Sequence, residues 1–263
     1  MLPSDQADAV LTDPPYGIDY RCFKGGAGPP GPRSGTSALR ADSSPGPSPR
    51  LPTPDSPLPP ARFARVLNDD APFIWWLREA WRVTRPRGCL ICFAGWQTSD
   101  AWREAIKWAG WRLRSMVIWD KEVPGLGDFQ QDFAPSHELI WFAVKPAHCR
   151  AAGFRFQRSG DSGKLDRPRS VLRCKVPSRS SRVHPTEKPV ELLRTLIRAT
   201  VPEGGLVLDP FAGSASTGEA ALTEGRRFAG CELSEAHHAN ATKRLTELAP
   251  PLDPVLQGAL KPR

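Results

Sequence analysis

A tetrapeptide near the start of the chain, Asp13-Pro14-Pro15-Tyr16, combines the groups with the most specific chemistry. It follows a short apolar run, residues 9–11, which predicts a buried strand that the two prolines end, because proline donates no ladder hydrogen bond. Catalytic groups collect at such strand ends in α/β folds. The Asp13 carboxylate and the Pro14 carbonyl suit the two hydrogens of an exocyclic amine, and the Tyr16 ring suits stacking on a planar base. A carboxylate at an ordinary proline-containing turn is the alternative, and the tetrapeptide alone leaves both interpretations open.

A second strand-to-turn pattern lies at residues 206–218, where an apolar run ends in Asp209 and continues through Pro-Phe-Ala-Gly213 into small residues. Such a turn lets a ligand approach the backbone closely and points the first N–H groups of the next helix at it. A further short strand, residues 226–232, ends in Glu232. Its distance from Asp209 along the chain approximates that of the acid that binds ribose hydroxyls in nucleotide-binding βαβ units. The turn and the acid together indicate a nucleotide-like cofactor.

With these motifs the chain resembles the DNA amino-methyltransferases that use S-adenosylmethionine, of the adenine-N6/cytosine-N4 type. Residues 12–17 resemble the catalytic motif of that family, and residues 209–213 resemble its cofactor motif. Residues 184–193, His-Pro-Thr-Glu-Lys-Pro-Val-Glu-Leu-Leu, are similar to the segment that lies against the methionine part of the cofactor. The order, catalytic motif first and cofactor motif last, matches the permuted β class, and the resemblance covers nearly the whole chain outside two inserts.

The resemblance implies methyl transfer to a flipped adenine, whose amino group is held by Asp13 and the Pro14 carbonyl while Tyr16 stacks on the ring. The rigid Pro14-Pro15 segment would fix these groups. The two corners must then lie side by side at neighbouring strand tips. The implied cofactor, S-adenosyl-L-methionine, would contact Thr186, Lys188, Asp209, Phe211, Gly213, Ser214 and Glu232, with Glu232 at the ribose and Thr186 and Lys188 near the methionine end.

Three functions stay open on this resemblance. Asp rather than Ser before Pro-Pro-Tyr favours adenine as a family tendency, which makes adenine-N6 methylation the first choice and cytosine-N4 methylation the alternative within the enzyme class. A DNA-binding remnant that transfers nothing is the alternative outside that class. The implied partner is double-stranded DNA, as in restriction-modification. A homodimer and a restriction partner are left open.

Two departures from the family pattern bear on activity. Ala215 stands where the family usually has a second glycine, and if this position needs a positive φ, alanine costs roughly 1 kcal/mol and brings a methyl group towards the cofactor. Many members also have a strand ending in Gly-Asp ahead of the catalytic motif, whereas this chain starts at Met1-Leu-Pro-Ser and residues 250–263 offer no replacement. We therefore expect the sheet to lack one edge strand.

The positive charge of the chain is concentrated in one segment. Residues 145–183 hold eleven Lys and Arg against two Asp, a net +9, so the rest of the chain sums to −1 within the total of +8. A solvated loop is the alternative, but the resembled family has its target recognition region here, which favours contacts with DNA phosphates and bases. The predicted DNA-binding residues are Arg155, Arg158, Lys164, Arg167, Arg169, Arg173 and Lys175.

Composition places the chain among globular α/β proteins. Its 263 residues suit one domain of ordinary size. No apolar run is long enough for a membrane span and the N-terminus has no signal pattern, so a cytoplasmic protein is expected. Cys89 and Cys92 lie in an apolar run at a spacing that puts them on opposite faces of a strand, which favours buried cysteines over a metal pair.

Alternating helical and strand patterns predict a mostly parallel sheet with helices on both faces, a Rossmann-like class I methyltransferase fold with circular permutation. Helices are predicted from Asn68 or Asp69 to Arg85, from Ser99 or Asp100 to Gly110, and over 190–200 and 235–248; further strands are predicted over 89–94, 112–119 and 138–144. The predicted organisation is a catalytic half (1–23 and 61–144), a Pro/Gly/Ser-rich insert expected to be disordered (24–60), the basic target-recognition segment (145–183), a cofactor-binding half (184–249) and a tail (250–263). The insert is interpreted as a tolerated expansion, with a functional lid as the alternative.

Overall fold

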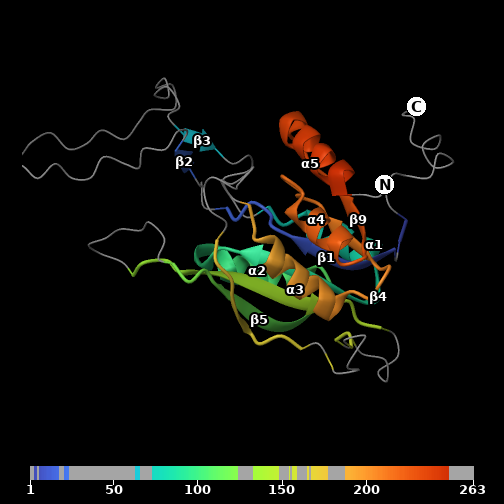
Figure 1. The fold of residues 1–263 in the computed structure, drawn as a ribbon. Coiled ribbons are helices and arrows are strands. Elements are labelled where there is room, and N and C mark those ends of the chain that lie inside the picture. Colours follow the sequence, from blue (N-terminus) through green and yellow to red (C-terminus); the bar gives the residue numbers. More distant parts are fainter. Residues whose placement is uncertain are drawn as a thin grey trace, which may run out of the picture.

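The computed structural model describes residues 3–4, 6–17, 21–23, 63–65, 73–123, 133–147, 154, 156–158, 165, 167–176 and 187–248. Seven strands form one sheet in the order β7-β5-β6-β4-β1-β8-β9. Figure 1 shows the ribbon of the whole fold. Four of the six neighbouring pairs are parallel, and β6 runs antiparallel to β4 and β5. The strands are β1 Ala7–Thr12, β4 Thr84–Ala94, β5 Arg112–Asp120, β6 His137–Val144, β7 Val171–Arg173, β8 Leu206–Asp209 and β9 Arg227–Gly230. The mostly parallel sheet is confirmed.

Helices cover both faces of this sheet, as predicted. The helices are α1 Trp76–Val83, α2 Ser99–Trp108, α3 Val190–Thr200, α4 Ser216–Thr223 and α5 Glu235–Leu248, with a short 3₁₀ helix η1 at Trp96–Thr98. One core cluster joins α3 and α4 to the sheet through residues such as Leu193 and Ala220. A second cluster joins α1 and α2 to the opposite face through Leu77 and Trp102. The apolar side chains of β1 divide between the two clusters, which makes β1 a central, fully buried strand.

The boundaries of α3 and α5 agree with the prediction, whereas the start of α1 does not. The predicted caps Asn68 and Asp69 lie outside the described residues, and the helix begins only at Trp76, without a side-chain cap. Phe73, which the predicted helix includes, precedes the observed helix and packs edge-on against Phe211 at 6.1 Å between ring centroids. The following strand also starts earlier than predicted, because Thr84 already pairs with Ala7.

At the edges of the sheet lie two short strands. β9 is the outermost strand on its side among the described residues, and the absence of a further edge strand stays a prediction. The opposite edge is β7, which belongs to the basic segment 145–183 and pairs in parallel with β5. β2 (Arg21–Phe23) and β3 (Phe63–Arg65) pair antiparallel in a separate two-stranded sheet. The insert 24–60 and the tail 250–263 lie outside the described residues.

The cysteine prediction is confirmed. Cys89 and Cys92 are both fully buried in β4, and they belong to the clusters on opposite faces of the sheet. Burial raises the pKa of the Cys89 thiol to about 12, so it stays protonated. No helix in the described ranges is long and apolar enough to cross a membrane.

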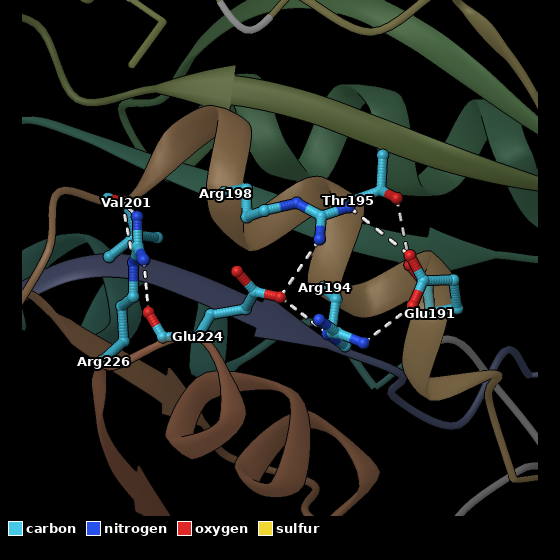
Figure 2. A network of polar contacts seen from close by, with 7 residues as sticks. All are labelled: Glu191, Arg194, Thr195, Arg198, Val201, Glu224 and Arg226. Atoms are coloured by element: carbon cyan, nitrogen blue, oxygen red, sulfur yellow. Dashed lines mark hydrogen bonds and ion pairs between the residues drawn. The ribbon is translucent and has the colours of Figure 1, made fainter. Parts of the chain in front are cut away.

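A polar network fixes the end of α4 against α3 (Figure 2). The carboxylate of Glu224, directly after α4, accepts hydrogen bonds from Arg194 Nε at 2.6 Å and Arg198 Nη1 at 3.2 Å. Arg226 donates to the carbonyl of Val201 at 2.9 Å and to that of Glu224. These contacts lie at the C-terminal end of α4 and fix the direction of the helix against α3.

Candidate active site

The two corners predicted to carry the chemistry lie side by side. β1 and β8 are parallel neighbours, so the turns after them leave the same edge of the sheet. The Thr12 hydroxyl, at the end of β1, donates to Asp209 Oδ1, at the end of β8, over 2.6 Å. The predicted adjacency of the proline corner (residues 13–16) and the glycine corner (residues 209–213) is confirmed.

Within the proline corner, the Asp13 carboxylate is bound through both of its oxygens. The Tyr16 hydroxyl donates to Oδ1 at 2.6 Å, and the Lys188 ammonium donates to Oδ2. Pro14 is buried, and the Tyr16 carbonyl accepts a hydrogen bond of 2.7 Å from the Thr98 hydroxyl of η1. The backbone of the corner is thus fixed from within by two prolines and from outside by η1.

Two charged residues that the sequence analysis missed complete this site. Glu138, in β6, lies with Oε2 3.0 Å from the Tyr16 hydroxyl and 3.3 Å from Lys188 Nζ. Lys121, which follows β5, binds the other Glu138 oxygen at 2.7 Å. The available signal was an acid at the start of the apolar run 138–144. Its position at the active edge follows only once β6 is known to run antiparallel to β4.

Burial and charge together set the proton affinities of this cluster. Burial raises the pKa of the Asp13 carboxyl; Lys188 opposes this rise and Glu138 adds to it. Burial alone would also raise the pKa of Glu138, but Lys188 and Lys121 outweigh it and lower that pKa to about 2. Burial disfavours the Lys188 cation, yet the two carboxylates raise its pKa. The pKa of Tyr16 lies well above its ordinary value because of burial and the same carboxylates. The cluster therefore holds a cationic lysine between acceptors.

In the glycine corner, Asp209 holds the turn through hydrogen bonds to its buried side chain. Its side chain is 2% exposed, and Oδ1 accepts the backbone N–H of Phe211 at 3.0 Å in addition to the Thr12 hydroxyl. Burial raises the pKa of Asp209 to about 6, and hydrogen bonds from Thr12, Thr217 and the Phe211 N–H limit the rise. Gly213 and Ala215 both have positive φ, +53° and +60°. The condition under which alanine is costly at position 215 is therefore met.

Glu232, predicted to end the next strand, lies two residues after the end of β9 at Gly230, and it contacts the same turn. Glu232 Oε2 accepts the Gly213 N–H at 2.9 Å, and Oε1 accepts the Ser234 N–H at 2.8 Å. A further contact was missed: Arg244 of α5 donates to the Ser214 carbonyl at 3.2 Å and pairs with Glu187 at 2.7 Å. The Phe211 ring packs edge-on against Trp76 at 5.4 Å. Thr186 lies outside the described residues.

The predicted DNA-binding residues separate into two groups. Arg158, Arg167 and Arg169 line an open cavity of about 1290 Å³ together with Phe154 and Phe156, whose rings pack on Phe142 of β6 at 5.2 and 5.9 Å. Arg173 and Lys175 lie in and just after β7, nearer the active edge, and Arg173 Nε is 3.5 Å from Asp120 at the end of β5. Arg155 and Lys164 lie outside the described residues.

Comparisons with known proteins agree on one family. Residues 7–243 match the N6_N4_Mtase family, described as DNA methylase. YubD of Escherichia coli (strain K12) is 28% identical over 245 residues, 93% of this chain and 84% of YubD. The type II methyltransferase M2.DpnII of Streptococcus pneumoniae is 29% identical over 174 residues, 65% of each chain.

Solved structures show the same fold. The M1.HpyAVI–SAM complex matches with a TM-score of 0.59 at 21% identity, covering 93% of this chain and 89% of that one. The cytosine-N4-specific PvuII DNA methyltransferase matches with a TM-score of 0.59 at 13% identity, covering 94% and 86%. At these identities the likeness establishes a class I methyltransferase fold.

Proposed function

The chain belongs to the N6/N4 family of DNA methylases, and from this premise we propose that it transfers a methyl group from S-adenosyl-L-methionine to the N6 amine of a flipped adenine in double-stranded DNA. The observation that carries the proposal is the hydrogen bond between Thr12 and Asp209, 2.6 Å long, at the tips of neighbouring parallel strands. This bond holds the proline corner against the glycine corner, so that the amine and the methyl donor can meet.

The glycine corner fits the proposed cofactor. A Cβ added at Gly213 would meet no atom within 4 Å, which leaves open space in front of the turn. Each oxygen of the Glu232 carboxylate accepts one backbone N–H and retains a further acceptor site, which suits the two hydroxyls of a ribose. Asp209, Phe211, Ser214, Thr186 and Lys188 complete the proposed cofactor set. The bound sulfonium supplies an electrophilic methyl group.

The proline corner supplies the acceptors for the amine. Asp13 and the Pro14 carbonyl are proposed to bind its two hydrogens, which frees the nitrogen lone pair from the ring, while Tyr16 stacks on the base. When the nitrogen gains the methyl group it becomes positively charged and loses one hydrogen as a proton. Asp13 is the nearest proposed acceptor, and burial has already raised its pKa. Lys188, placed on Asp13, favours the ionised carboxylate before the base arrives.

The basic segment is proposed to hold the DNA. Arg173, with a side chain 76% exposed beside the active edge, is suited to a phosphate near the flipped base. The cavity-lining arginines are suited to phosphates further along the duplex. These phosphate contacts are independent of the DNA sequence. The cytoplasmic location and a homodimer stay predictions.

Methylation of plasmid DNA followed by nucleoside analysis tests the proposal. We expect N6-methyladenine; N4-methylcytosine would support the alternative enzyme instead. Asp13→Ala should lower methyl transfer by at least about 100-fold and leave cofactor affinity within about twofold. Asp100→Asn, which removes an exposed carboxylate from α2, is the matched control and should remain active.

Calorimetry separates the enzyme from the inactive remnant. Binding of S-adenosyl-L-methionine together with methyl transfer supports the enzyme. A folded protein that binds DNA but neither binds the cofactor nor methylates would refute the proposed function.

A further inference from the structure

Glu138 reaches both of the groups that bind the Asp13 carboxylate. The Tyr16 hydroxyl lies 2.6 Å from Asp13 Oδ1 and 3.0 Å from Glu138 Oε2. Lys188 Nζ contacts Asp13 Oδ2 and lies 3.3 Å from the same Glu138 oxygen. A tyrosine hydroxyl has one hydrogen to donate, so these two distances describe two alternative acceptors for it.

The proposed reaction requires Asp13 to exchange partners. Both of its oxygens are occupied by donors from the protein, and an incoming amine has to compete with them. A hydroxyl or an ammonium displaced from Asp13 in this part-buried site would carry a desolvation cost unless another acceptor took its hydrogen. Glu138 is placed to be that acceptor, because it needs no more than a small movement of either donor.

The charges around Glu138 suit this role. Lys121 binds the second Glu138 oxygen at 2.7 Å and so anchors the carboxylate while leaving Oε2 directed at the two donors. With both carboxylates ionised, the two lysines and two acids of the cluster sum to zero. The cluster stays neutral when Lys188 moves from one carboxylate to the other.

We propose that Glu138 is a positioning residue that takes over the Tyr16 hydroxyl and the Lys188 ammonium when the amino group of the target base docks on Asp13. This inference rests on the proposed function and adds a step to it. Glu138 itself does not touch the base. Its effect is to leave the Asp13 oxygens free to accept the hydrogens of the amine.

The test is Glu138→Gln, which keeps the shape of the side chain and removes its charge. We expect kcat for methyl transfer to fall roughly 10- to 100-fold, because a charged hydrogen bond is lost at the docking step, while cofactor affinity stays within about twofold. The acid limb of the kcat profile should also move to lower pH. The ionisable groups facing Asp13 are Tyr16, Lys188, Glu138, Asp209 and Cys92, and the variant removes one negative neighbour from this set. Lys188→Met should move the acid limb in the opposite direction.

The control is Glu122→Gln, which removes an exposed carboxylate next to Lys121 and should leave kcat and its pH profile unchanged. Glu138→Asp keeps the charge but withdraws the oxygens, and it tests the same step if the glutamine variant does not fold; we expect about a tenfold fall in kcat. A variant at position 138 with wild-type kcat, or a slower Glu138→Gln enzyme whose acid limb has not moved, would overturn the inference while leaving the proposed function standing. A wild-type protein that methylates no DNA would refute both.

Discussion

The buried carboxyl of Asp209 makes the stability of the fold depend on pH in a direction that the structure determines. The informative perturbation is Asp209→Asn. Both the Thr12 hydroxyl and the Phe211 N–H donate to the same oxygen, Oδ1, so an amide oxygen in that place keeps both bonds. The amide nitrogen would replace the second oxygen, and the Thr217 hydroxyl, which also hydrogen-bonds to this side chain, can rotate from donor to acceptor. The variant therefore removes a titrating group with little change in contacts.

The magnitude follows from the shift in the pKa of Asp209, from an ordinary 3.8 to about 6 in the folded protein. Between these values the folded state binds the proton more tightly than the unfolded state, so stability falls as the pH rises through this window. Above the window the ionised carboxylate destabilises the fold by about 3 kcal/mol. Acidification from about pH 7.5 to about pH 5 should recover about 1.4 kcal/mol of this. The Asp209→Asn variant lacks this dependence, because an amide does not titrate in this range.

Urea unfolding of both proteins at these two pH values measures the effect. The free energy of unfolding of the wild type should gain about 1.4 kcal/mol relative to Asp209→Asn on acidification. Asp13 also has a raised pKa, and the part of this rise that burial causes is common to both proteins and cancels in the difference. Glu138 loses its stabilising charge only below the ordinary glutamate value of 4.5, outside the range compared. Thr12→Val removes one hydrogen-bond donor to Asp209, so the stability of this variant should depend more steeply on pH than that of the wild type. If the free energy of unfolding changed equally with pH in the wild type and in Asp209→Asn, the reasoning would be refuted.

Three further predictions concern the cofactor corner and its support. Ala215→Gly should change the free energy of unfolding by less than about 1 kcal/mol in urea titrations, because relief of the left-handed backbone is offset by chain entropy and a lost buried methyl; a loss above about 2 kcal/mol would contradict this balance. Arg244→Met should weaken cofactor binding by about tenfold in calorimetry, because the Ser214 carbonyl loses its donor from α5; Arg103→Met, on the exposed side of α2, is its control. Glu224→Ala should lower urea stability by only about 1–2 kcal/mol, because Glu191 remains as a partner for Arg194 and Arg198; a loss above about 4 kcal/mol would show that Glu191 does not compensate.

The parts of the fold that could be predicted from the sequence are those with strong local signals. The bounds of α3 follow from an amphipathic pattern that ends shortly before Pro202, and the strands β1 and β8 follow from apolar runs ended by sharp turns. The start of α1 could not be predicted, because no side chain caps it; Phe73, which precedes the helix, packs on Phe211 instead. β7 has three residues within a basic segment and no alternating pattern, and only its pairing with β5 defines it as a strand.

The same distinction applies to the site. Asp13, Tyr16, Asp209 and Glu232 could be found because each lies at the end of a short predicted strand or in the turn that follows it. Glu138 could not, because its role depends on the direction in which β6 runs. Lys188 was expected beside the cofactor as part of a motif. Its contact with Asp13, 175 residues away along the chain, depends on where α3 begins relative to the tip of β1.

The arrangement also explains why the order of the motifs along the chain is immaterial to the chemistry. β1 lies between β4 and β8, so the Asp13 corner has the glycine corner on one side and η1, which follows β4, on the other. Antiparallel β6 returns Glu138 to this edge, and α3 starts from it with Lys188 just ahead of its first turn. Each group reaches the site as the end of an element that is fixed in the core. A circular rearrangement that kept the strand order would therefore keep the contacts of Asp13, whereas a register shift in β6 by one residue would turn Glu138 to the other face of the sheet and remove the second acceptor.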